Sequence, residues 1–233
     1  MAGILFIISA PSGSGKSTLV NQIKSLVDNL EFSISYTTRL PRGSEVEGQQ
    51  YHFTTRENFE RMVRNDEFLE HAEVFGNYYG TARLSLTHAQ AHSKDLLLDI
   101  DVQGAAQVRK KVADSVSIFV LPPAPNILAT RLRNRSRAEG GVTEEVILRR
   151  LAEARAEIVN YREYSYILVN DILSRAEDEL LAIVASERMH REDCNSIEDA
   201  ERLLKLAESC RLENSGARVR PVLKAFGLLD PEV

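Results

Sequence analysis

The residues best suited to chemistry lie near the start of the chain, between Ser9 and Thr18. Gly13 and Gly15 let the backbone bend so that successive N–H groups point inward, and a helix beginning here adds its positive end. Lys16 supplies a charge for β- and γ-phosphates, and Ser17 a hydroxyl suited to Mg²⁺. The stretch therefore predicts a loop that holds a polyphosphate.

The segments on either side are those that such a loop requires. The apolar run Ile4 to Ile8 precedes it, and apolar residues at helical spacing from Leu19 to Val27 follow it. This order indicates strand, phosphate loop and helix. Ala10 stands where the pattern G-x-x-x-x-G-K-[ST] has its first glycine. A simple connecting turn is the alternative, but Gly-Lys-Ser at the start of a helix is seldom met by accident.

Composition restricts the class of protein. The 233 residues carry a net charge of -5, with 43% hydrophobic and 27% charged residues, which suits one or two ordinary globular domains. The acidic balance argues against a general nucleic-acid binder. There is no basic signal-peptide region, no apolar run of the ~18 residues that span a membrane, and Cys194 and Cys210 suit reduced thiols. We therefore expect a cytoplasmic protein with no nucleic-acid or membrane partner.

Further apolar runs predict buried core strands at 96–101, 116–121 and 166–169, each followed by a helical stretch. The last of these helices is expected to be capped at Ser174 and to run to about Met189. Strands of this kind that alternate with helices favour an α/β fold with a central parallel β-sheet flanked by helices. A ligand should lie at the carboxyl ends of the strands.

Residues 34–93 form a predicted insertion of small strands and one or two helices between the first helix and the next core strand. The expected parts are an alternating strand over 31–36, an arginine-bearing loop at 37–43, a helix with a capping box at 54–57, a strand over 68–75 and a turn over 76–80.

Arginines gather on both sides of the Gly140–Gly141 break, and Thr143 starts a second helix after it. They are Arg131, Arg133, Arg135, Arg137, Arg149 and Arg150. The pattern predicts a lid made of a helix, a mobile loop and a helix. For any single arginine, an exposed position on a solvated helix is the alternative.

Two other features carry no predicted chemistry. His88 and His92 have the spacing of two zinc ligands, but the Glu of H-E-x-x-H is missing and no third ligand is evident, so we interpret them as partly exposed histidines. Residues 191–233 contain an amphipathic helix and are interpreted as a helical extension that packs on the main domain or on another subunit.

Together these motifs resemble the guanylate kinase family, whose members transfer the γ-phosphate of ATP to GMP. The matching segments follow the family order: 9–18, 35–42, 48–53, 68–72, 76–81, 98–104 and 169–171. The resemblance implies a P-loop kinase domain over 1–190, with a core of 1–33 and 94–190, a GMP-binding insertion over 34–93 and a helical lid at about 131–150. Residues 191–233 have no counterpart in the family's common core.

The resemblance also implies an acceptor site. The positions that hold the GMP phosphate match Arg39, Arg42, Tyr51 and Tyr79, and those that read guanine match Ser35, Glu70, Thr81 and Asp101. Arginine forks and phenol donors suit a dianion. Guanine offers N1–H and N2–H₂ donors to a carboxylate such as Glu70, whereas the N1 acceptor of adenine would leave that carboxylate unpaired.

On the donor side, the ATP-binding positions match Ala10, Pro11, Ser12, Gly13, Ser14, Gly15, Lys16, Ser17, Thr18 and Asn170. The resemblance assigns catalysis to Lys16, Arg39, Arg131, Arg135 and Arg150, and Mg²⁺ to Ser17, with Asp101 and Asp99 reached through water. No general base is needed, because a GMP phosphate oxygen is already an anionic nucleophile. Two departures affect the lid: Ser136 replaces the usual glycine, and the spacing from Arg135 to Arg150 is longer than in the family.

The expected function is ATP-dependent phosphorylation of GMP and dGMP in purine nucleotide metabolism. Two other interpretations remain open. One is a P-loop kinase with a different phosphorylated acceptor, and the other is a guanylate-kinase-like module that binds phosphopeptides without catalysis. The intact Gly15-Lys16-Ser17, with Asp101 and the lid arginines, favours an enzyme. The sequence does not decide between a monomer and a homo-oligomer.

Overall fold

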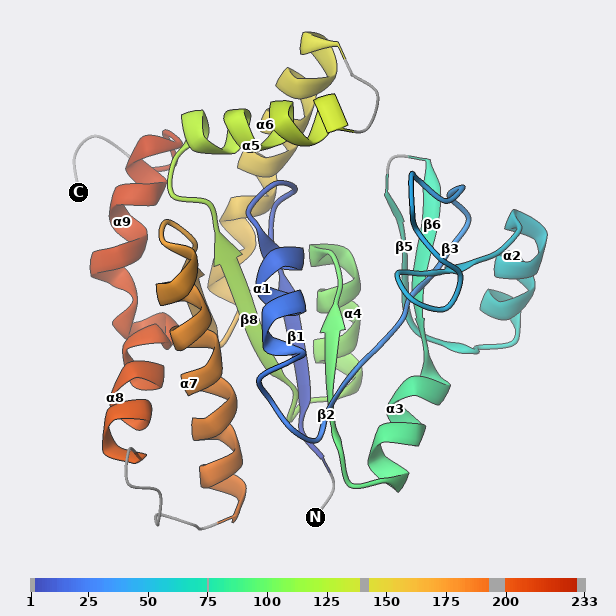
Figure 1. Cartoon of the computed structure of the whole chain (residues 1–233), viewed down its shortest axis with the longest axis horizontal. Coiled ribbons are helices and arrows are strands. Elements are labelled where there is room, and N and C mark those ends of the chain that lie inside the picture. The colour runs from blue at the N-terminus through green and yellow to red at the C-terminus, as the bar shows by residue number, and fades with distance from the viewer. Residues whose placement is uncertain (1–2, 75, 139–142, 193–199, 230–233) are drawn as a thin grey trace. The chain divides into compact units, whose positions relative to one another are not determined.

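The structure is a computed structural model that describes residues 3–74, 76–138, 143–192 and 200–229 (Figure 1). Two β-sheets are present in this part of the chain. The strands of the larger sheet follow the order β2-β7-β1-β8-β9, and those of the smaller sheet the order β4-β3-β6-β5. The predicted fold class, an α/β fold with a central parallel sheet, flanking helices and a mixed α/β insertion, is confirmed.

The strands of the larger sheet are β1 (Leu5–Ser9), β2 (Leu30–Phe32), β7 (Asp95–Asp99), β8 (Val116–Leu121) and β9 (Tyr166–Val169). Those of the smaller sheet are β3 (Tyr36–Thr37), β4 (His52–Phe53), β5 (Phe68–Val74) and β6 (Asn77–Ala82). The helices are α1 (Lys16–Ile23), α2 (Arg56–Arg64), α3 (Arg83–Ala91), α4 (Val102–Lys111), α5 (Pro125–Ala138), α6 (Glu144–Ile158), α7 (Leu173–Glu192), α8 (Ala200–Cys210) and α9 (Gly216–Ala225).

The chain divides into two compact units, and the first contains the residues up to Ile8 together with Asn29–Val116. In this unit β1 and β2 both pair with β7 in parallel, with Leu5 opposite Leu96. In the smaller sheet β6 runs antiparallel to β3 and β5. Helix α2 packs Phe59 against Phe68, with ring centroids 4.5 Å apart. Apolar burial of this kind holds the smaller sheet together.

The second unit contains Ser9–Asp28 and the chain from Ser117 onward. Strands β8 and β9 pair in parallel, with Ile118 opposite Tyr166. Helices α7 and α8 pack side by side, as Figure 1 shows. After α8 the chain returns to β9, where the Leu212 N–H donates to the Ser165 carbonyl over 3.0 Å. The C-terminal extension therefore packs on α7 and β9 of its own chain.

Several predicted boundaries were wrong. The first helix ends at Ile23 and not at Val27. Just after this end the Ser25 hydroxyl and the Ser25 N–H both donate to the Gln22 carbonyl, which turns the chain. The strand expected over 31–36 is two strands, since Leu30–Phe32 pairs with β7 whereas Tyr36 and Thr37 pair with β4 and β6.

Two further corrections concern turns and caps. The turn expected over 76–80 is largely strand β6, because Tyr78 and Tyr79 pair with residues of β5. Helix α2 is capped by Thr55, whose hydroxyl accepts the Asn58 N–H, and α7 begins at Leu173, before the predicted Ser174 cap. The segment 196–199, whose sequence favours a cap for the amphipathic helix of the C-terminal extension, lies outside the described residues. Among those that are described, no helix has both the length and the apolar character to cross a membrane.

Candidate active site

The phosphate loop has the bent backbone that its glycines predict. Gly13 and Gly15 have φ values of 86° and 91°, a conformation that side chains disfavour. A Cβ atom on Gly13 would lie 2.9 Å from Leu128 of α5, and one on Gly15 would lie 2.3 Å from the Asn170 amide nitrogen. Both positions therefore require glycine. Helix α1 follows directly, with Gly15 as its N-cap and Lys16 as its first residue.

Arg131 and Asn170 fasten this loop from two other elements. Arg131, on α5, donates to the Ser14 carbonyl over 3.1 Å and to the Asn170 carbonyl over 3.0 Å. The Asn170 amide, just after β9, donates to the same Ser14 carbonyl over 2.8 Å. Burial lowers the pKa of Arg131 from its ordinary value, because it destabilises the charged guanidinium. A nearby anion would relieve that cost.

Two buried polar atoms at the loop lack hydrogen-bond partners among the described residues: the Ser14 hydroxyl and the Asn170 amide oxygen. Leaving such an atom without a partner costs about 1–3 kcal/mol, so the arrangement calls for water or a polar ligand. The side chains of Ser17 and Thr18 are exposed at the start of α1, and Lys16 is half-buried.

The predicted lid arginines lie on α5 and α6. Arg133 forms an ion pair with Glu144, which joins the two helices. Arg150 is half-buried on α6. Arg135 belongs to α5, but its side chain lies outside the described residues, as does the predicted mobile loop at 139–142.

Three of the four residues predicted to hold the acceptor phosphate come together. The Arg39 guanidinium lies 5.2 Å from the centre of the Tyr51 ring, and the Tyr51 and Tyr79 rings are 5.8 Å apart. Arg39 is only 8% exposed. Burial works against its charge, but hydrogen bonds with Glu45 and Tyr79 raise the pKa of Arg39 above its ordinary value. The fourth residue, Arg42, is exposed in the same loop.

Glu45 organises this loop, and sequence reasoning missed it. Its carboxylate accepts hydrogen bonds from both terminal nitrogens of Arg39, each over 2.9 Å, and from the Arg42 N–H over 2.7 Å. A bidentate pair of this kind fixes the orientation of a guanidinium. The available signal was the position of an acid within the same short loop as both arginines.

Of the predicted guanine-reading residues, Thr81 and Asp101 lie near Glu70. Glu70 is 3% exposed on β5 and pairs across the sheet with Thr81 of β6. Burial raises the pKa of Glu70 to about 7, with a further contribution from the charge of Asp101. The Asp101 carboxylate caps α4 by accepting the Gly104 N–H over 2.8 Å. Ser35 directly precedes β3, and its carbonyl accepts the His52 N–H over 2.9 Å.

The two acids predicted to reach Mg²⁺ through water lie at the end of β7 and just after it. Asp99 is the last residue of this strand and lies opposite Ile8, and Asp101 follows two residues later. Within the described residues, no group of three His, Cys, Asp or Glu side chains gathers in a position to hold a metal ion.

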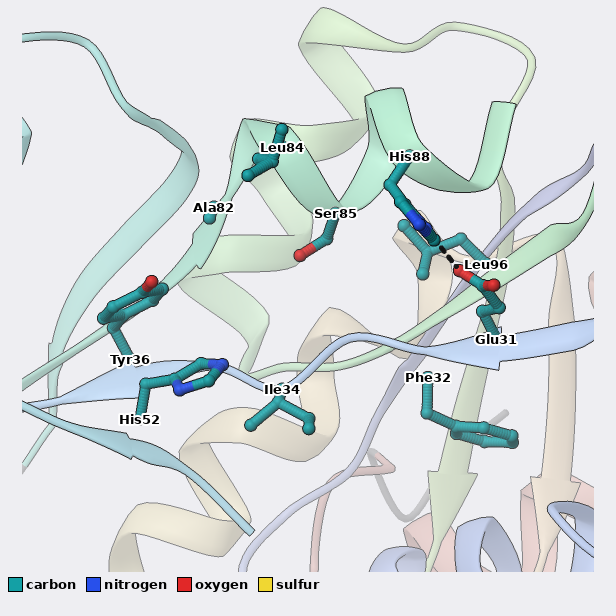
Figure 2. A pocket seen from close by; sticks show the side chains of 10 residues that line it. All are labelled: Glu31, Phe32, Ile34, Tyr36, His52, Ala82, Leu84, Ser85, His88 and Leu96. Carbon is teal, nitrogen blue, oxygen red and sulfur yellow. Dashed lines mark hydrogen bonds and ion pairs between the residues drawn. The ribbon is translucent and has the colours of Figure 1, made fainter. Parts of the chain in front are cut away.

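A separate cavity of about 290 Å³ lies in the first unit and contains none of the predicted site residues (Figure 2). Figure 2 shows Leu84, Ser85 and His88 of α3 on one side and Glu31, Phe32 and Ile34 on another. Glu31 accepts from Lys94 over 2.8 Å and contacts His88 at 3.2 Å, and the Lys94 bond is the main reason that the pKa of Glu31 is lowered.

A glycine loop between a buried parallel strand and a helix, within a helix-flanked sheet, is typical of the P-loop nucleotide-binding proteins of the α/β class. Comparison with known proteins gives the family: the model described as guanylate kinase matches residues 3–187. The chain belongs to the guanylate kinase family and is an enzyme of that family.

Individual relatives agree. The chain is 53% identical over 226 residues to the guanylate kinase of Koribacter versatilis, covering 97% of both chains. It is 47% identical over 190 residues to that of Escherichia coli K12, covering 80% of this chain and 89% of the relative. The crystal structure of guanylate kinase from Anaplasma phagocytophilum superposes with a TM-score of 0.64 at 29% identity, covering 98% of this chain and 97% of that one. The match to Koribacter shows that the C-terminal extension has a counterpart in at least one relative.

Proposed function

We propose that this protein transfers the γ-phosphate of ATP to GMP, forming ADP and GDP, as a cytoplasmic step of purine nucleotide metabolism. The observation that carries the proposal is the buried Glu70 carboxylate, next to Thr81 and close to the charge of Asp101. A carboxylate is the acceptor that the N1–H and N2–H₂ donors of guanine require. Adenine would leave it unpaired, which costs about 1–3 kcal/mol.

The phosphate of GMP is assigned to Arg39, Arg42, Tyr51 and Tyr79. The Arg39, Tyr51 and Tyr79 side chains already form one cluster, and Glu45 holds Arg39 in place. Because these contacts and those of Glu70 concern the phosphate and the base, loss of the ribose 2′-hydroxyl removes none of them. We therefore extend the proposal to dGMP.

ATP is assigned to the phosphate loop and Asn170. Inward N–H groups and the start of α1 favour negative charge, and Lys16 adds a cation. The partnerless Ser14 hydroxyl and Asn170 amide oxygen are available to a polar ligand. Arg131, Arg135 and Arg150 are proposed to neutralise charge on the transferring phosphoryl group, which needs positioning and electrostatic stabilisation rather than a general base.

The residues proposed for Mg²⁺ fit that ion, since the exposed Ser17 hydroxyl and the Asp99 and Asp101 carboxylates are hard oxygen donors. When bound, Mg²⁺ would neutralise charge on the β- and γ-phosphates. Ser17 is proposed as the direct contact, and the two acids are proposed to act through water.

The test is a coupled assay of ADP release with Mg-ATP and GMP, dGMP, AMP, CMP or UMP. We expect turnover with GMP and dGMP and little with the other nucleotides. An absence of GMP-dependent turnover would overturn the proposed function, and equal rates with AMP would overturn the assignment of Glu70.

A second test separates the two substrate sites. Lys16→Ala is expected to abolish turnover, because the charge on the β- and γ-phosphates is then not neutralised, while GMP binding remains largely intact. Calorimetric titration with GMP measures the latter. A parallel loss of GMP affinity would show that Lys16 serves the acceptor site.

A further inference from the structure

We propose that helix α4 positions Glu70 for guanine recognition, through Gly104 and Gln107. The inference rests on the proposed function, in which Glu70 reads the base. It concerns the first unit alone, which contains both α4 and the strand β5 that carries Glu70.

Gly104 lies where the Glu70 carboxylate approaches α4. A Cβ atom at position 104 would lie 2.3 Å from Glu70 Oε2, 2.9 Å from its Cδ and 3.2 Å from Asp101 Oδ1. Real contacts of a Cβ atom are essentially never shorter than 3.0 Å, so the carboxylate at the end of the Glu70 side chain would have to move. The N–H of the same glycine holds Asp101 over 2.8 Å. One residue therefore separates the two carboxylates and sets their spacing.

The choice of glycine at this position has no local explanation. Gly104 lies inside α4 and does not have a positive φ, so its backbone conformation is open to any residue. Glycine is disfavoured in a helix relative to alanine. The close approach of Glu70 supplies the reason for its presence.

Gln107 holds the backbone on one side of Glu70. Strand β5 is at the edge of the smaller sheet, so one row of its backbone groups has no neighbouring strand. The Gln107 side chain takes the place of a strand: its Oε1 accepts the His71 N–H over 3.3 Å, and its Nε2 donates to the His71 carbonyl over 2.7 Å.

Lys111, one helical turn further along α4, donates to the Leu69 carbonyl over 2.6 Å. The residues immediately before and after Glu70 are thus both bonded to α4. The hydrogen bonds from Gln107 and Lys111 therefore fix the backbone from which the Glu70 carboxylate extends.

The experiment uses GMP and inosine monophosphate, which lacks the exocyclic 2-amino group of guanine. The ratio of kcat/KM for GMP to kcat/KM for inosine monophosphate measures the contact between that amino group and Glu70. A loss of folded protein lowers both values equally, so a merely structural role of Gly104 or Gln107 would not change the ratio.

Gly104→Ala is expected to raise KM for GMP about tenfold or more and to leave KM for ATP unchanged. It should lower the ratio by a smaller factor, because inosine monophosphate keeps N1–H and loses that contact as well. Gln107→Met keeps the length of the side chain without its amide, and is expected to lower the ratio about threefold. The matched controls are Gly216→Ala, whose Cβ meets nothing within 4 Å, and Lys110→Ala, an exposed neighbour on α4.

Wild-type protein without GMP-dependent turnover would refute the proposed function. Wild-type turnover with unchanged ratios in both α4 variants would refute the inference alone. Should Gly104→Ala fail to fold, Gln107→Met decides the question. Ratios that fall in the α4 variants but not in the two controls would support the positioning role.

Discussion

At the scale of single residues, Glu70 decides the proposed specificity, and its environment makes that specificity depend on pH. Burial raises the pKa of Glu70 to about 7, above the usual value for a glutamate. The carboxylate form, which is proposed to accept both guanine donors, therefore predominates only above that pH. Under this proposal, proton loss from Glu70 and recognition of GMP are linked.

We expect kcat/KM for GMP to be constant above about pH 7 and to fall about tenfold per unit below it, because a proton must leave Glu70 before guanine binds. Steady-state kinetics across this range, with ATP saturating, measures the effect.

Glu70→Gln provides the control for this profile. It should show lower affinity throughout and no transition near pH 7, since an amide does not titrate. Its remaining pH dependence reports the second ionisation of the GMP phosphate, at about pH 6. A wild-type curve that follows the variant's curve would contradict the assignment.

At the scale of elements, the phosphate loop is held by its neighbours as much as by its own sequence. Gly15 combines a φ of 91° with close approach to the Asn170 amide, and Arg131 joins the loop to the end of β9. The loop is therefore preorganised before any nucleotide binds, which reduces the entropy lost on binding.

Gly15→Ala should destabilise the fold and raise KM for ATP for two reasons. Alanine is strained at the positive φ of this position, and its Cβ atom would clash with the Asn170 side chain. Gly43→Ala separates these effects: Gly43 has a φ of 53° but no atom within 4 Å of an added Cβ. We expect a loss of about 1–2 kcal/mol in the free energy of unfolding for Gly43→Ala and a larger loss for Gly15→Ala. Denaturant titration gives both values, and equal losses would contradict the role of Asn170.

At the scale of the whole molecule, the proposed donor and acceptor residues fall into different compact units. The phosphate loop, Asn170 and the lid arginines belong to one, and the residues from Ser35 to Asp101 belong to the other. The unit with the phosphate loop also contains the C-terminal extension. Arg218 of α9 donates to Glu179 of α7, and to the Ile167 carbonyl of β9 over 3.1 Å.

Arg218→Met should destabilise the protein by about 3 kcal/mol, because Glu179 has a side chain only 4% exposed and would lose its counter-ion. Burial already raises the pKa of Glu179, and Arg218 opposes that shift. The loss should therefore shrink as the pH falls, since a protonated Glu179 needs no counter-ion. Denaturant titration at two pH values measures both effects.

The double variant Glu179→Leu with Arg218→Met is the control, and it should regain much of the lost stability because no buried charge is left. A single variant as stable as the wild type would show that the extension is not anchored through this pair.

The sequence predicted the elements whose signals are local. Strands β8 and β9 have the bounds expected from their apolar runs, and the phosphate loop follows a buried strand as its pattern required. These predictions succeeded because a continuous apolar run, or a Gly-Lys-Ser at the start of a helix, is defined by adjacent residues. The resemblance to guanylate kinases came from motifs of the same local kind.

Only the tertiary structure decided what depends on residues far apart in the chain. The alternating segment 31–36 divides between two sheets because β2 pairs with β7 whereas β3 pairs with β6. Similarly, Gln107 donates to the His71 carbonyl at the edge of β5, 36 residues away in the chain. The roles of Glu45, Gly104 and Gln107 are not evident from the sequence, because a carboxylate, a glycine and an amide are common residue types. Their roles depend on distances to Arg39, Glu70 and His71, which are set when the chain packs.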